Sequence, residues 1–85
     1  MPDVVLYGTR FCPYCIAARR LLKRKSVDFK DIGVDGNPKL RAEVMQRSGQ
    51  RTVPQIWVGK THVGGFDDLQ HMDHNGKLDK LLASA

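Results

Sequence analysis

The chain has 85 residues, two cysteines and a net charge of +5, from 14 lysines and arginines against 9 acidic residues. This length predicts one small domain, residues 1–85, near the lower limit for a core that needs no added cross-links. No stretch approaches the roughly 20 apolar residues that span a bilayer, and no secretory signal opens the chain. We therefore expect a cytoplasmic protein with no membrane partner.

Much of the positive charge is local. Such a cluster attracts nucleic acid or an acidic protein surface. It is equally typical of a solvated helix face whose cations lie toward the C-terminal end of the helix. Because no aromatic residues alternate with the cations, we favour the solvated face and expect no nucleic-acid partner. The basic residues that crowd this predicted helix are Arg19, Arg20, Lys23, Arg24 and Lys25.

The first half of the chain predicts a strand, a helix and a second strand. Val4–Tyr7 is an almost wholly apolar, β-rich run, which favours a strand buried on both faces. Pro13–Lys25 carries apolar residues at helical spacing, and Val27–Ile32 alternates like a strand with one solvated face. Strand, helix and strand at this spacing form a βαβ unit, so the two strands should be parallel.

The second half predicts a helix, a hairpin and two short helices. Asn37 as N-cap with Pro38 in the first turn starts a helix that should end at Gly49, in a left-handed cap. The sheet is therefore expected to be four-stranded and mixed, with helices around it, in an α/β fold. The remaining elements are strands at Gln55–Val58 and Thr61–Gly64 around a Gly59–Lys60 turn, a helix from Phe66, and a last helix after Gly76.

The two cysteines stand together in Cys12-Pro13-Tyr14-Cys15, at the predicted start of the first helix. Thiols at this spacing can close a small disulfide. The unsatisfied N–H groups and the positive dipole end of the helix stabilise a thiolate at Cys12. In a reducing compartment such a pair is catalytic or metal-binding rather than a structural cross-link. We therefore predict a redox-active pair.

Three motifs, in order and at matching spacing, make the sequence resemble the glutaredoxin family over nearly its whole length: Cys12-Pro13-Tyr14-Cys15, Thr52-Val53-Pro54 and Gly64-Gly65-Phe66-Asp67-Asp68-Leu69. The likeness is to the small bacterial dithiol members, the class of the third glutaredoxin of enteric bacteria. It implies a thioredoxin-like fold and a monomeric, glutathione-dependent thiol–disulfide oxidoreductase in cell redox homeostasis and electron transport. Glutathione would be a co-substrate, with no tightly bound cofactor. The implied partners are glutathionylated or disulfide-containing proteins and, indirectly, glutathione reductase.

The site residues follow from the motifs and the resemblance. Cys12 is the predicted nucleophile, with electrostatic support from Arg10, and Cys15 the resolving thiol, which is dispensable when a second glutathione completes deglutathionylation. The resemblance implies a cis Val53–Pro54 bond that presents the Val53 backbone to the bound peptide. The residues expected to bind glutathione are Arg10, Tyr14, Arg41, Thr52, Val53, Pro54, Gly65, Phe66, Asp67 and Asp68.

The charged ends of glutathione divide between two parts of this site. Backbone N–H groups near Asp67 and Asp68 could hold the γ-glutamyl carboxylate, with the Asp68 side chain on the ammonium, although both acids equally suit a helix start. For the glycyl carboxylate, relatives commonly place a lysine three residues before the nucleophile, where this chain has Thr9. Arg10 or Arg41 could replace that lysine, and the sequence leaves the choice open.

Metal binding is the alternative from a different functional class. Cys12 and Cys15 with His71 and His74 resemble a zinc ligand set, but the histidine spacing is shorter than usual. A bridging iron–sulfur cluster on Cys12 of two subunits with glutathione is a second variant, disfavoured by Pro13. A plain thioredoxin is the nearest enzymatic alternative, from which the middle dipeptide Pro13-Tyr14 differs. We expect no metal.

Overall fold

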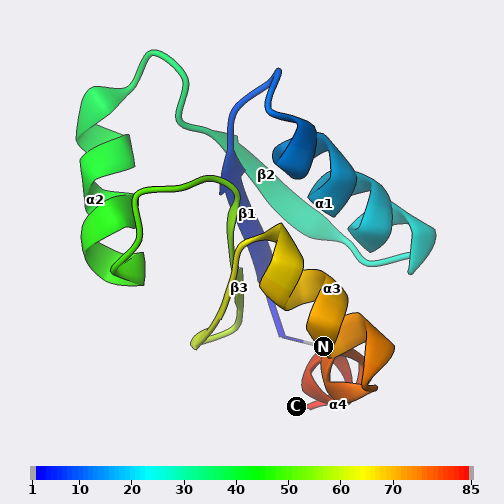
Figure 1. Cartoon of the computed structure of the whole chain (residues 1–85). Helices are drawn as coiled ribbons and strands as arrows, with labels where there is room; N and C mark the ends of the chain where they lie inside the picture. The colour runs from blue at the N-terminus through cyan, green and yellow to red at the C-terminus, as the bar shows by residue number, and fades with distance from the viewer. Residues whose placement is uncertain (1, 85) are drawn as a thin grey trace.

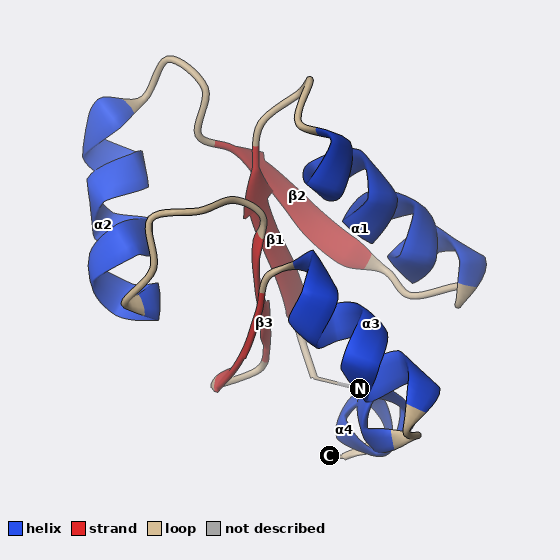
Figure 2. Cartoon of the chain, in the orientation of Figure 1, coloured by secondary structure: helices blue, strands red, loops and turns tan. Residues whose placement is uncertain are grey.

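The computed structural model describes residues 2–84, which form one mixed sheet with helices on both faces (Figure 1). Helices α1 and α3 cover one face and α2 the other, as the colouring by secondary structure makes clear (Figure 2). In chain order the elements of the described residues are β1 Val4–Gly8, α1 Pro13–Arg24, β2 Phe29–Gly33, α2 Pro38–Ser48, β3 Gln55–Val58, β4 Thr61–Gly64, α3 Phe66–His74 and α4 Lys77–Ala83.

The sheet has the strand order β2-β1-β3-β4. β1 pairs with β2 in parallel, and β3 is antiparallel to both β1 and β4. The parallel pair is the predicted βαβ unit and the antiparallel pair β3–β4 is the predicted hairpin. The predicted α/β fold with a four-stranded mixed sheet is therefore confirmed.

The main core lies between the sheet and the helices α1, α3 and α4. Its centre is apolar and fully enclosed, because the helical stripe of α1 faces the inward side chains of β1 and β3. α4 adds leucines from the C-terminal end of the chain. The buried members of this cluster are Val4, Leu6, Ala18, Leu21, Leu22, Val27, Ile56, Val58, Leu69, Leu78 and Leu82.

A smaller core lies on the opposite face, under α2. It is built on Val34, Val44 and Trp57, with Tyr7 packed against it. Arg47 of α2 lies 4.5 Å from the centre of the Trp57 ring and donates a hydrogen bond of 3.2 Å to the Tyr7 hydroxyl. The guanidinium of Arg47 therefore covers part of the sheet face that lies under α2.

β1 is less enclosed on the face covered by α2 than its sequence predicts. Val4 and Leu6 are buried on the main-core face, whereas Val5 and Tyr7 on the α2 face are only half-buried. The expectation of a strand buried on both faces was therefore wrong for the second face. The physical reason is that α2 meets the sheet through a few side chains rather than a continuous apolar stripe.

The second strand starts later than predicted. The sequence favoured a strand from Val27, but β2 begins at Phe29. The N–H of Val27 donates to the carbonyl oxygen of Leu22 at 3.0 Å, and the side chain of Val27 is 7% exposed. Val27 therefore completes the end of α1 and joins the main core, and its N–H is not available for the sheet.

The caps of α2 follow the predicted pattern. The Asn37 side chain accepts a hydrogen bond of 3.2 Å from the Leu40 N–H, and Pro38 occupies the first turn. Gly49 has φ 71°, a left-handed conformation that suits glycine. No helix within residues 2–84 has the length and apolar character needed to cross a membrane.

The basic cluster of α1 is only partly a solvated face. Lys25 Nζ lies 2.7 Å from Asp73 and 2.8 Å from Asp79, which ties the end of α1 to α3 and α4. These hydrogen bonds raise the pKa of Lys25. Arg19 pairs with a carboxylate of β2, so three cations of the cluster remain exposed: Arg20, Lys23 and Arg24.

Candidate active site

The two thiols occupy different environments within one helical turn. Cys12 is the N-cap of α1 and half-buried, whereas Cys15 lies one turn deeper and is fully buried. Both are free cysteines. The Thr9 N–H approaches the Cys15 sulfur at 3.5 Å. Pro13 fits the first turn because its nitrogen carries no hydrogen that would need an acceptor.

These environments shift the acidities of the thiols in opposite directions. Burial opposes ionisation of Cys12, but the N–H groups of Cys15 and Tyr14, the Cys15 thiol and the charge of Arg19 together lower the pKa of Cys12. Burial raises the pKa of Cys15, and the adjacent Cys12 adds to that rise, while the Thr9 N–H offsets only part of it. The more accessible thiol is therefore the better nucleophile near neutral pH.

Arg19 supplies charge that supports the Cys12 thiolate, a role that the sequence had assigned to Arg10. The N–H of Arg10 donates to Asp35 at 3.0 Å, and its guanidinium lies 5.7 Å from the centre of the Phe11 ring. The Arg10 N–H holds the pKa of Asp35 below its usual range. Arg19 could have been found from its spacing of four residues from Cys15, which places both on one helix face.

Gly8 permits Cys15 and Arg19 to lie close to the end of β1. A Cβ atom at Gly8 would lie 2.9 Å from the Cys15 sulfur and 3.3 Å from Nη2 of Arg19. The first of these is closer than a real Cβ can approach, so the end of β1 needs glycine where it meets the buried thiol. Arg19 is held there by a hydrogen bond of 2.8 Å to Asp31 of β2.

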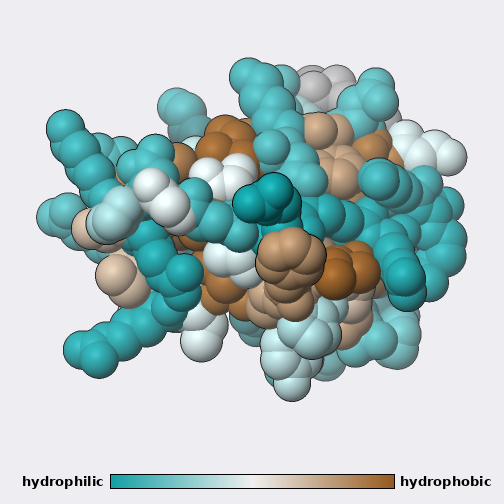
Figure 3. Space-filling model, turned by 90° about the horizontal axis from the view of Figure 1, so that it is seen from above, coloured by the Kyte–Doolittle hydropathy of each residue, from teal (hydrophilic) through white to brown (hydrophobic). Residues whose placement is uncertain are grey.

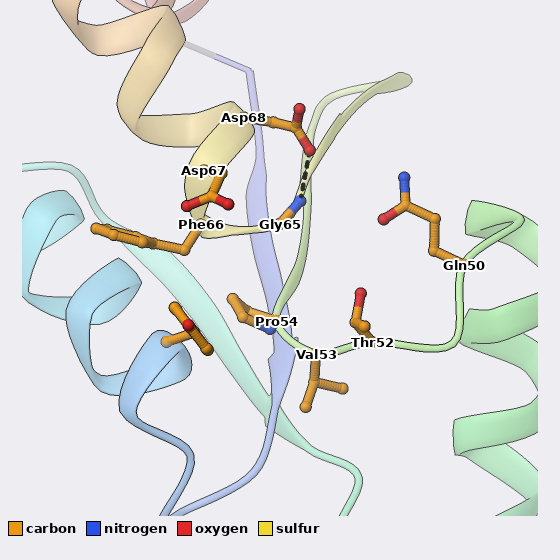
Figure 4. A pocket seen from close by; sticks show the side chains of 9 residues that line it. Gln50, Thr52, Val53, Pro54, Gly65, Phe66, Asp67 and Asp68 are labelled. Atoms are coloured by element: carbon orange, nitrogen blue, oxygen red, sulfur yellow. Dashed lines mark hydrogen bonds between the residues drawn. The ribbon is translucent and has the colours of Figure 1, made fainter.

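A groove of about 330 Å³ lies beside the thiols (Figure 4). The Cys12 thiol is 3.8 Å from the carbonyl oxygen of Val53, which precedes a cis bond to Pro54. Of the residues expected to bind glutathione, Arg10 and Arg41 do not line the groove. Gln50, which lies in none of the three sequence motifs, does line it. The lining residues are Tyr14, Gln50, Thr52, Val53, Pro54, Gly65, Phe66, Asp67 and Asp68.

The start of α3 forms one wall of this groove. Oδ2 of Asp68 accepts a hydrogen bond of 3.2 Å from the N–H of Gly65, drawn as a dashed line in Figure 4. Gly64 has φ 117°, and a Cβ there would collide with the Asp68 carboxylate. The first N–H groups of a helix have no helical acceptor, so this wall can bind an anion while its acids can bind a cation.

Exposed apolar side chains lie close to Cys12 in the sequence. Phe11 and Tyr14 are 83% and 60% exposed, and Ile16 is 37% exposed. The end of the molecule that carries this loop, seen in Figure 3, has hydrophobic residues in its middle and hydrophilic side chains on both sides. Such a surface can contact the chain around a substrate sulfur as well as the sulfur itself.

The residues weighed as zinc ligands are not assembled into a metal site. Among residues 2–84, no three His, Cys, Asp or Glu side chains are grouped as metal coordination requires. His71 and His74 lie on α3, whereas Cys12 is the N-cap of α1 and Cys15 lies in its first turn. The two histidines and the two cysteines therefore belong to different helix segments.

Known proteins have a similar sequence and a similar fold. The family model described as Glutaredoxin matches residues 4–63. A glutaredoxin of Pseudomonas aeruginosa is 58% identical over 84 residues, covering 99% of this chain and 100% of the relative. Glutaredoxin 3 of Escherichia coli is 46% identical, covering 96% and 99%. The crystal structure of a buckwheat glutaredoxin–glutathione complex superposes with a TM-score of 0.89 at 28% identity, covering 95% of this chain and 76% of that one.

The sequence likeness extends over nearly the full length of both bacterial relatives, and the fold is that of a protein solved with glutathione. The predicted resemblance is therefore confirmed, and with it a thioredoxin-like fold. The accessible thiol of lowered pKa, with a buried partner one turn away, is the arrangement that disulfide exchange needs. The chain belongs to the glutaredoxin family and is a glutathione-dependent thiol–disulfide oxidoreductase.

Proposed function

We propose that the chain reduces glutathione mixed disulfides through Cys12 alone and protein disulfides through Cys12 and Cys15 together. The observation that carries this proposal is the asymmetry of the two thiols. Cys12 is accessible beside the groove and has a lowered pKa, whereas Cys15 is buried and has a raised pKa. One thiol is suited to attack a substrate, and the other to act only after a mixed disulfide has formed on the first.

In deglutathionylation, the Cys12 thiolate attacks the glutathione sulfur of a mixed disulfide. The protein sulfur leaves as a thiolate, takes up a proton, and Cys12 now carries glutathione. The thiolate of a second glutathione attacks the bound glutathione sulfur, which forms glutathione disulfide and restores the Cys12 thiolate. Cys15 forms no covalent bond in either step.

In the reduction of a protein disulfide, Cys12 attacks one sulfur and the other leaves as a thiol. Cys15 then loses its proton and attacks the Cys12 sulfur, which releases the second protein thiol and leaves a Cys12–Cys15 disulfide. Two glutathione molecules reduce this disulfide and leave as glutathione disulfide. We propose a cytoplasmic monomer for which glutathione reductase, with NADPH, regenerates glutathione.

Glutathione is proposed to lie in the groove with its sulfur toward Cys12. The Val53 backbone would pair with its cysteine residue, and Tyr14, Thr52, Pro54, Gly65 and Phe66 would enclose it. The N–H groups at the start of α3, near Asp67 and Asp68, would hold the γ-glutamyl carboxylate, and the Asp68 side chain would hold the ammonium. Arg10 and Arg41 lie outside the lining and remain the candidate cations for the glycyl carboxylate.

Two variants test this assignment of roles. Cys12→Ser is expected to abolish turnover of both a glutathionylated peptide and a protein disulfide. Cys15→Ser should retain turnover of the glutathionylated peptide and lose reduction of the protein disulfide by the dithiol route. Coupled NADPH oxidation by glutathione reductase measures both reactions. Equal loss in the two variants would contradict the separate roles, and visible absorbance of a cluster in the purified protein would favour metal binding instead.

A further inference from the structure

Gln50 is the lining residue of the groove that sequence motifs did not identify. Its side chain stands on the opposite side of the groove from Gly65 and Asp68 (Figure 4). It lies just after α2, in an exposed part of the chain. An exposed glutamine is ordinarily mobile, and ordering it on binding costs conformational entropy. Its contribution to ligand affinity therefore depends on which contacts hold it in place beforehand.

Two sets of hydrogen bonds hold Gln50. Its backbone N–H donates to the Ser48 hydroxyl at 3.1 Å, and the same hydroxyl lies 3.2 Å from the Gln50 carbonyl oxygen. Its side-chain Oε1 accepts a hydrogen bond of 3.1 Å from Nε2 of Gln55. Gln55 is fully buried and is the one polar side chain in the core of the described residues. Gln50 is therefore anchored at both ends to fixed groups.

The direction of these hydrogen bonds is determined by the backbone. Nε2 of Gln55 lies 3.0 Å from the carbonyl oxygen of Thr52, and a carbonyl oxygen can only accept. The nitrogen of the Gln55 amide must therefore face Thr52 and its oxygen must face the other way, toward Nε2 of His62 at 2.7 Å. That His62 nitrogen must carry the proton, so His62 donates in either of its charge states.

The orientation of Gln50 follows from that of Gln55. Since Gln55 offers N–H toward Gln50, Gln50 must offer its oxygen in return, and its own amide nitrogen is left outside this network. Among the hydrogen bonds of residues 2–84, none uses this Gln50 nitrogen. The network thus leaves two N–H donors of a groove-lining residue outside the hydrogen bonds of the described residues, while Gln55 holds that residue from the core.

We propose that the Gln50 amide nitrogen is a specificity-determining donor that binds a carboxylate or carbonyl oxygen of the bound glutathionyl group, oriented by Gln55, Thr52 and His62. This inference rests on the proposed use of the groove for glutathione. It adds a neutral donor opposite the acidic wall at the start of α3. Because Gln50 contacts a part of the substrate remote from the sulfur, it should affect binding more than the chemical step.

The decisive substitution is Gln50→Glu. One carboxylate oxygen can still accept from Gln55, while the other replaces the donor by a negative charge that repels an acceptor oxygen. With a glutathionylated peptide we expect KM to rise about tenfold with kcat nearly unchanged, and about threefold for Gln50→Ala. The matched control is Gln46→Glu, an exposed position of α2 outside the groove, which makes the same change of net charge. Equal KM values for the two glutamate variants would overturn the proposal.

A binding measurement separates this proposal from the proposed reaction. Unreactive S-methylglutathione is titrated into the native protein, and the side-chain amide signals of Gln50 are followed by NMR beside the backbone signal of Gly65. We expect both to shift, with the Gln46 amide unchanged. A shift of Gly65 alone would overturn the role of Gln50 and leave the groove as the glutathione site. No shift at either residue would overturn both, whereas shifts at both in a protein without turnover would overturn only the proposed reaction.

Discussion

Cys12 and Cys15 are separated by two residues, yet their thiols have opposite shifts in acidity. Cys12 is the N-cap of α1 and Cys15 lies in its first turn, so the positive end of the helix dipole is near both thiols. The distinction comes from burial, since Cys15 is enclosed by the core and Cys12 is at its edge. The Cys15 thiol in turn donates toward Cys12 and favours the thiolate there. The buried thiol therefore helps to activate the exposed one before it acts itself.

Alkylation of the reduced protein measures this difference. Because the pKa of Cys12 is lowered, its reaction with iodoacetamide should reach half of its maximal rate at a lower pH than that of an unperturbed cysteine. Cys15, with its raised pKa, should react only at higher pH and slowly. Mass spectrometry of the separated peptides assigns the sites. Cys15→Ala should move the Cys12 midpoint upward, and a midpoint unchanged by this substitution would exclude the activating role of Cys15.

At the level of residues, the site residues that belong to short sequence motifs could be predicted. A residue that reaches the site only through contacts in the folded chain could not. Cys12, Thr52–Pro54 and Gly65–Asp68 lie in short motifs, and they line one groove or adjoin it. Gln50 belongs to no motif and reaches the groove because Gln55, on a strand, holds it. Arg10 was selected for being near Cys12 in sequence, but its guanidinium lies beside the Phe11 ring.

Among the elements, α2 depends most on individual side chains. Its limits were predictable because Asn37 and Gly49 act locally, as N-cap and left-handed C-cap. Its attachment to the sheet was not, since Arg47 meets Trp57 and Tyr7 only in the folded chain. The late start of β2 has a similar origin, because Val27 has the composition of a strand residue and is used by the end of α1.

Arg47→Ala tests this attachment. The substitution removes the cation from the Trp57 ring and the hydrogen bond to Tyr7, and we expect the free energy of unfolding in urea to fall by about 1 kcal/mol. Arg20→Ala on the exposed face of α1 makes the same change of charge and helix propensity without these contacts, so it should be nearly neutral. Equal losses of stability in the two variants would show that the ring contact contributes nothing.

At the scale of the whole molecule, charge is the property most relevant to substrate encounter. The net charge is +5, and the cations of α1 that remain exposed lie on the helix that begins at Cys12. Glutathione carries two carboxylates and one ammonium, so a mixed disulfide with it brings net negative charge to the site. A positive protein attracts such a substrate over a distance of about one Debye length, roughly 10 Å at 0.1 M salt.

This attraction predicts a salt dependence that differs between substrates. Raising ionic strength from about 0.02 M to about 0.5 M should lower kcat/KM for a glutathionylated neutral peptide several-fold, because the screening length shortens well below the size of the site. The rate at which the reduced protein attacks hydroxyethyl disulfide, which carries no charge, should change little over the same range. Arg20→Glu combined with Lys23→Glu reverses two exposed charges of α1 and should flatten the dependence on salt for the charged substrate. If both substrates respond equally to salt in the native protein, the effect lies in the thiolate of Cys12 itself, and the surface charge does not steer glutathione.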